Sequence, residues 1–96
     1  MEVRIQAIHF DANDRLVAFI NKKAERLQRH CQDITTVDVK LSVVKPETVM
    51  NKEAVVTVLV PQEEFVATKV ANTFEEAIDL CLEAVERMAE KRKDKK

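Results

Sequence analysis

Two histidines and two cysteines are the first side chains of this sequence to consider as zinc ligands or as a base and nucleophile. His30 and Cys31 are adjacent, and adjacent helical residues point about 100° apart, so the two cannot readily share a metal or act as base and nucleophile. A zinc site would need both of them to converge with His9 and Cys81 from distant segments. Both cysteines lie at apolar helical positions outside any CxxC pair, so we predict buried, reduced thiols. The sequence predicts no catalytic residue, no metal site and no cofactor.

The composition excludes several classes of protein. The chain has 96 residues, of which 46% are hydrophobic and 34% charged, and this is typical of one soluble globular domain. It contains no glycine, so it can hold no glycine-rich phosphate loop, dinucleotide fingerprint or nucleophile elbow. Its four aromatic residues are all phenylalanine, which argues against RNA binding by base stacking. No apolar run is long enough for a signal peptide or a membrane span, so we expect a cytoplasmic protein without a membrane partner.

Hydrophobic periodicity predicts the elements that would position the charged residues. Alternation of apolar and polar side chains predicts strands from Val3 onward and over residues 37–43, 53–60 and 65–71. Spacings of three and four predict helices over about residues 14–31 and from about 74 into the nineties. Asn13 is the expected cap of the first helix, and Thr73 with Glu76 has the spacing of a capping box. Lys45-Pro46 should end the second strand, with turns over residues 47–51 and 61–64.

This order, β-α-β-β-β-α, predicts an α+β two-layer sandwich. Short turns favour an antiparallel meander for the last three strands, and both helices bury their apolar stripes on one face of a four-stranded sheet. We predict a single domain over residues 1–96, with a basic tail at about 91–96 that is partly frayed. The expected core consists of Leu16, Ile20, Leu27, Val39, Leu41, Val58, Phe74, Ile78, Val85 and Met88.

The net charge of −1 conceals a row of like charges on the first helix. On a helical wheel Lys22, Arg26 and Arg29 fall within about 60° of Arg15, and Lys23 lies beside them. Like charges at these spacings destabilise a helix, and a surface that is merely soluble usually mixes both signs. A solvated helix face is the ordinary interpretation of such a row, and the single sign of its charges weakens that interpretation relative to a binding surface for an anion.

The second helix carries charges of both signs on different arcs. Arg87 and Lys91 form one line. If the two helices pack side by side, this line and the row on the first helix would flank a common basic groove, suited to a polyanion such as an RNA backbone. An acidic outer arc, with no cation beside it except Lys93, is formed by Glu75, Asp79, Glu83, Glu86 and Glu90.

Several short segments, taken in order, resemble the ribosome hibernation promoting factors, also called ribosome-associated inhibitors or sigma-54 modulation proteins. These segments are DRL at residues 14–16, KAERLQRH at 23–30, IT at 34–35, VDVKLSVVK at 37–45 and AID at 77–79, followed by the basic tail. The resemblance covers essentially the whole chain, and the order of elements agrees with that family. One departure is Ala84, because the family often has a lysine at the middle of the triplet that reads Glu83-Ala84-Val85 here.

The resemblance implies a non-enzymatic factor that binds the small (30S) ribosomal subunit at the decoding region and silences the ribosome in starvation or stationary phase. It also implies a short form of the family without the C-terminal dimerisation domain, which would need a partner, such as a second hibernation factor, to pair ribosomes. The residues that match the family's rRNA-binding positions are Lys22, Lys23, Arg26, Arg29, Arg87 and Lys91, with Lys45 at the strand end.

A different interpretation of the same charges is a regulator that binds another protein through the acidic arc of the second helix. Co-sedimentation with ribosomes at low and moderate salt would separate the two interpretations, since phosphate contacts weaken with salt.

Overall fold

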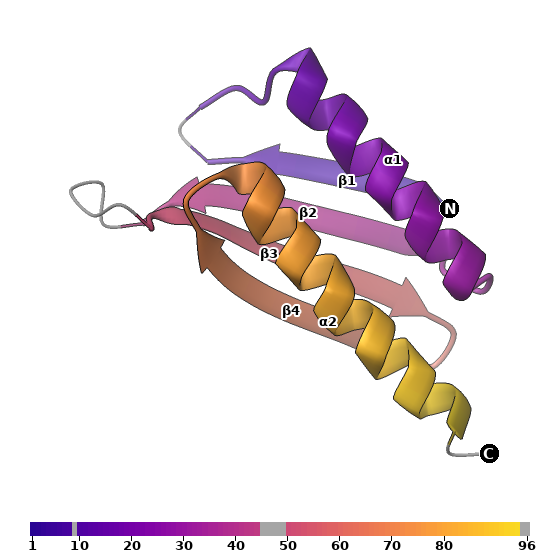
Figure 1. Ribbon diagram of the computed structural model, residues 1–96. Coiled ribbons are helices and arrows are strands. Elements are labelled where there is room, and N and C mark those ends of the chain that lie inside the picture. Colours follow the sequence, from indigo (N-terminus) through magenta and orange to yellow (C-terminus); the bar gives the residue numbers. More distant parts are fainter. Residues whose placement is uncertain (9, 45–49, 95–96) are drawn as a thin grey trace.

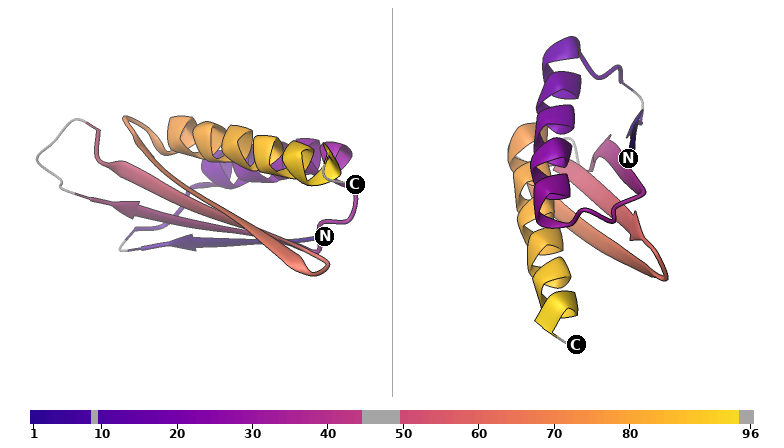
Figure 2. Two further views of the ribbon diagram at one scale, coloured as in Figure 1. Left: turned by 90° about the horizontal axis from the view of Figure 1, so that it is seen from below. Right: turned by 90° about the vertical axis from the view of Figure 1, so that its right-hand side faces the viewer.

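Two helices cover one face of a four-stranded sheet in the computed structural model (Figure 1), which describes residues 1–8, 10–44 and 50–94, with side chains up to residue 91. The predicted α+β two-layer architecture and the β-α-β-β-β-α order are confirmed. Figure 2 shows both helices on the same side of the sheet, while the opposite face of the sheet is uncovered. The elements are β1 (Glu2–Ala7), α1 (Asp14–His30), β2 (Thr36–Val43), β3 (Lys52–Val60), β4 (Glu63–Ala71) and α2 (Phe74–Asp94).

The sheet has the strand order β1-β2-β3-β4. β1 and β2 run parallel, and α1 supplies the crossover that parallel neighbours require. β2, β3 and β4 form the predicted antiparallel meander. Val39 is paired with Ile5 on one side and with Val56 on the other, so apolar residues of three strands share the face that carries the helices.

The turn between β3 and β4 is shorter than predicted. It consists of Pro61 and Gln62, and β4 begins at Glu63 rather than at Phe65. Gln62 has a φ of 69°. This is the left-handed conformation that glycine usually adopts, and because the chain has no glycine, Gln62 adopts it instead. Proline followed by a residue with positive φ is typical of a type II turn. The predicted strand end at Lys45-Pro46 and most of the predicted turn over 47–51 lie outside the described residues.

Both helices begin at the predicted caps. The Asn13 side-chain oxygen accepts a hydrogen bond from the Leu16 backbone N–H at 2.8 Å. The Thr73 hydroxyl oxygen accepts one from the Glu76 N–H at 3.1 Å. Each contact satisfies one of the N–H groups that the first turn of a helix leaves without an intrahelical partner.

Replacing Asn13 by alanine is expected to lower the free energy of unfolding by about 1 kcal/mol, because the Leu16 N–H loses its acceptor. Asn13→Ser keeps an acceptor oxygen and should stay close to the wild-type value. Urea unfolding of the two variants gives the comparison. Equal stability of Asn13→Ala and Asn13→Ser would show that this cap does not stabilise α1.

The core lies between the helices and the sheet, and eight of its ten predicted residues are buried there. The other two, Phe74 and Met88, are partly buried and pack against it. Phe74 is the first residue of α2 and stacks on Phe10 with ring centroids 4.8 Å apart, at the margin of the core. Leu82 was not predicted to be in the core, yet it is 7% exposed, so the apolar face of α2 is wider than predicted on one side.

Candidate nucleic-acid interface

The cations of α1 lie on the side of the helix opposite the sheet. Leu16, Ile20 and Leu27 are buried against the core, and this orientation leaves Lys22, Arg26 and Arg29 exposed. Those three residues and Lys23 line one shallow hollow, which also includes Glu25. The predicted row is therefore a continuous, accessible surface in which positive charges outnumber the one carboxylate.

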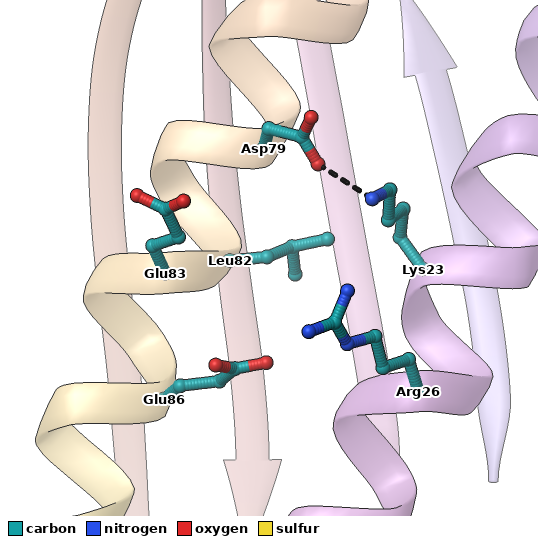
Figure 3. A pocket seen from close by; sticks show the side chains of 6 residues that line it. All are labelled: Lys23, Arg26, Asp79, Leu82, Glu83 and Glu86. Carbon is teal, nitrogen blue, oxygen red and sulfur yellow. Dashed lines mark ion pairs between the residues drawn. The ribbon is translucent and has the colours of Figure 1, made fainter.

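A second hollow lies between the two helices, and we call it the interhelical groove (Figure 3). Lys23 and Arg26 line it from α1, and Asp79, Leu82, Glu83 and Glu86 line it from α2. The Lys23 ammonium and the Asp79 carboxylate form an ion pair across it at 3.0 Å. The Glu86 carboxylate extends toward α1, whereas the Glu83 side chain runs along α2 and does not reach toward α1. The groove therefore contains charges of both signs.

This arrangement corrects the prediction of a groove that is basic on both walls. Among the residues described, the α2 side is lined by Leu82 and three acidic residues, not by Arg87 and Lys91. Arg87 follows Glu86 by one residue and so points about 100° away from it, on the side of α2 turned away from α1. Lys91 is one turn farther along the same side, and both residues are exposed. The basic surfaces of the two helices are thus separate.

The acidic arc of α2 also differs from its prediction as a purely outer face. Asp79 and Glu86 are only partly exposed, and Asp79 has a cationic partner on the neighbouring helix. The cause is Leu82, since packing this side chain between the helices brings its acidic neighbours on the wheel into the groove. Leu82 falls next to Ile78 and Val85 in the apolar pattern. With Leu82 in the predicted core, the acidic residues beside it on the helical wheel would have been predicted to line the groove between the helices.

The remaining predicted site positions contribute less. Lys45 lies outside the described residues. Ala84, the departure from the family pattern noted in the sequence, is partly buried and adds no charge to the side of α2 that bears Arg87.

The histidine and cysteine residues have structural surroundings. The prediction that both cysteines are buried thiols is confirmed. The Cys31 thiol donates to the Asp33 carboxylate at 3.0 Å. The Cys81 thiol donates to the Ala54 carbonyl at 3.2 Å, and burial raises its pKa to about 11.

His30 is exposed, and His9 lies outside the described residues. Within the described ranges, no three His, Cys, Asp or Glu side chains are grouped so that they could hold a metal ion. Neither α1 nor the described part of α2 is long and apolar enough to cross a membrane.

Comparison with known proteins gives consistent matches. The family model described as sigma 54 modulation protein / S30EA ribosomal protein matches residues 3–96. A ribosome hibernation promoting factor from Azotobacter vinelandii is 32% identical over 95 residues, which cover 99% of this chain and 85% of that protein.

Two solved structures share the fold. One is a ribosomal subunit interface protein from Coxiella burnetii, with a TM-score of 0.86 and 19% identity over 98% of this chain and 99% of that one. The other is the N-terminal domain of Protein Y from Thermus thermophilus, with a TM-score of 0.78 and 19% identity over 92% and 94% of the two chains.

Proposed function

Because the chain belongs to the sigma 54 modulation protein / S30EA ribosomal protein family, we propose that it is a ribosome hibernation factor. In this proposal it binds the small ribosomal subunit at the decoding region and blocks translation during starvation or stationary phase. The name of the Azotobacter vinelandii relative, similar over almost the full chain, supports the hibernation role. Binding alone would account for the effect, so no catalytic step is required.

The observation that carries the proposal is the exposed row of cations on α1. Lys22, Arg26 and Arg29 project from one face of a helix that is fixed to the sheet along its other side. A rigid row of positive charges fits the regularly spaced phosphates of an RNA strand. We assign the rRNA phosphate contacts to this row; Lys23 lies at its border, where its ammonium is paired with Asp79.

Arg87 and Lys91 supply a second, smaller contact in this proposal. They lie on the side of α2 that is turned away from α1, so they would meet a different stretch of the rRNA backbone from the α1 row. The two surfaces together would orient the protein on the subunit rather than enclose one strand between two basic walls.

Co-sedimentation of the purified protein with small ribosomal subunits over a series of potassium chloride concentrations tests the proposal. We expect binding whose logarithmic affinity falls linearly with the logarithm of the salt concentration, with a slope of roughly −0.7 to −0.9 per phosphate contacted. The bound protein should also prevent tRNA from binding to mRNA-programmed subunits. Lack of binding, or binding that is insensitive to salt, would contradict the proposal. Binding that leaves tRNA binding intact would contradict the decoding-region location.

A further inference from the structure

Lys23 is engaged by the protein from two sides. Its ammonium lies 3.0 Å from the Asp79 carboxylate and 5.4 Å from the centre of the Phe19 ring. The Lys23 side chain is 26% exposed and that of Asp79 47% exposed. An ammonium that is partly shielded, paired and packed on an aromatic face is less available to an external anion than the exposed Lys22 beside it.

The interhelical groove around this ion pair is unfavourable for RNA phosphates. Its lining contains two cations, Lys23 and Arg26, and three carboxylates, of which those of Asp79 and Glu86 extend toward α1. A phosphate entering the groove would come within a Debye length, about 8–10 Å, of the Asp79 and Glu86 carboxylates and be repelled by both. Of the three residues in the row only Arg26 lines this groove, so the repulsion acts on Lys22 and Arg29 from a greater distance.

We propose that Asp79 is a positioning residue that holds Lys23 away from RNA and that, together with Glu86, it excludes RNA phosphates from the interhelical groove. Phosphates are then received on the outer row of α1 and on the separate Arg87 and Lys91 surface of α2, and not between the helices. This inference rests on the proposed function, and it makes the two acidic residues determinants of specificity. They weaken binding to any RNA that would settle between the helices and leave the outer row open to a strand of the right shape.

A double-mutant cycle with a fluorescein-labelled oligouridine as the probe tests the inference. The background variant is Asp79→Asn with Glu86→Gln, which removes two negative charges without changing the size of either side chain. At low salt its affinity for the probe should rise about three- to tenfold, because two repulsive charges are lost. The slope of its logarithmic affinity against the logarithm of the salt concentration should become more negative by about 0.7 for each additional phosphate contacted.

Lys23→Ala provides the other side of the cycle. In the wild-type protein, where Lys23 is paired with Asp79, the substitution should change the affinity for oligouridine by less than about twofold. In the neutralised background, where a phosphate can take the place of the carboxylate, it should lower the affinity about fivefold. An equal effect of Lys23→Ala in both backgrounds would overturn the inference.

Two controls exclude a general effect of net charge and an effect of lost stability. Asp38→Asn with Glu64→Gln makes the same change in net charge on the uncovered face of the sheet, and its gain in affinity should be clearly smaller. Glu86→Gln alone leaves the Lys23–Asp79 pair in place and should give an intermediate gain, so the test stands even if the double substitution destabilises the fold. An equal gain in the sheet-face control would refute the role of the groove.

Co-sedimentation of the wild-type protein with small ribosomal subunits separates this inference from the proposed function. Coupling in the oligouridine cycle without binding to subunits would uphold the electrostatic role of Asp79 and overturn the proposed function. Binding to subunits without coupling in the cycle would support the proposed function and overturn the electrostatic role of Asp79.

Discussion

Charge reversal at Arg26 and Arg29 is expected to remove most of the affinity of this protein for small ribosomal subunits. Both residues are exposed, and they lie three residues apart and therefore on adjacent turns of one face of α1, where Arg26 also borders the interhelical groove. Arg26→Glu with Arg29→Glu eliminates two phosphate contacts and places two carboxylates against the RNA. We expect a loss on the order of 100-fold at moderate salt, and a salt slope reduced by about one for each residue. Inhibition of translation in a cell-free system should be relieved in parallel.

The matched control for this variant is Arg4→Glu with Lys40→Glu. It changes the net charge by the same amount. Arg4 in β1 and Lys40 in β2 are exposed, and by the alternation of side chains they belong to the face of the sheet that carries no helix. Binding to subunits should remain within a fewfold of wild type, because screening leaves little interaction across the molecule. Equal losses in the two variants would mean that net charge, and not the α1 row, governs binding.

If Glu83→Lys with Glu86→Lys lost subunit binding while the Arg26/Arg29 variant kept it, an interaction through the acidic arc of α2 would replace the proposed function.

Most of the fold was predictable because its elements carry strong and mutually consistent local signals. The alternation over residues 37–43 placed β2, and the side-chain acceptors of Asn13 and Thr73 marked where the helices begin. Parallel pairing of β1 with β2 then follows from the helix between them. The turn at Pro61 and Gln62 was predicted too long because no glycine marks its left-handed position.

The candidate site was predictable only where it depends on a single helix. The row of Lys22, Arg26 and Arg29 follows from helical periodicity alone, and the three residues are exposed as that periodicity requires. The groove depends on how two helices are rotated against each other, and this rotation is set by packing. One buried side chain, Leu82, turns the acidic arc of α2 toward α1 and turns Arg87 away.

The same dependence on packing makes Leu27 a position where a single substitution should cost much stability. Leu27 is 1% exposed and lies in the last turns of α1, where its own backbone carbonyl accepts the hydrogen bond from the Cys31 N–H that ends the helix. Leu27→Ala removes buried methyl groups and leaves a cavity, so the free energy of unfolding should fall by about 2–5 kcal/mol. A domain of this size is stable by roughly 5–15 kcal/mol in total, so this loss is a large share. Urea unfolding measures it directly.

Gln28→Ala is the matched control, because it also introduces alanine, at the next residue of the same helix, where the side chain is only partly buried. Its effect on stability should stay within about 0.5 kcal/mol of zero. If Leu27→Ala cost no more than Gln28→Ala, the packing of α1 on the sheet would be refuted. At a temperature where the Leu27→Ala protein is still folded, its binding to small subunits should persist, because Lys22, Arg26 and Arg29 are unchanged. Binding lost in step with the folded fraction would confirm that the core acts on function only by holding the cationic row in place.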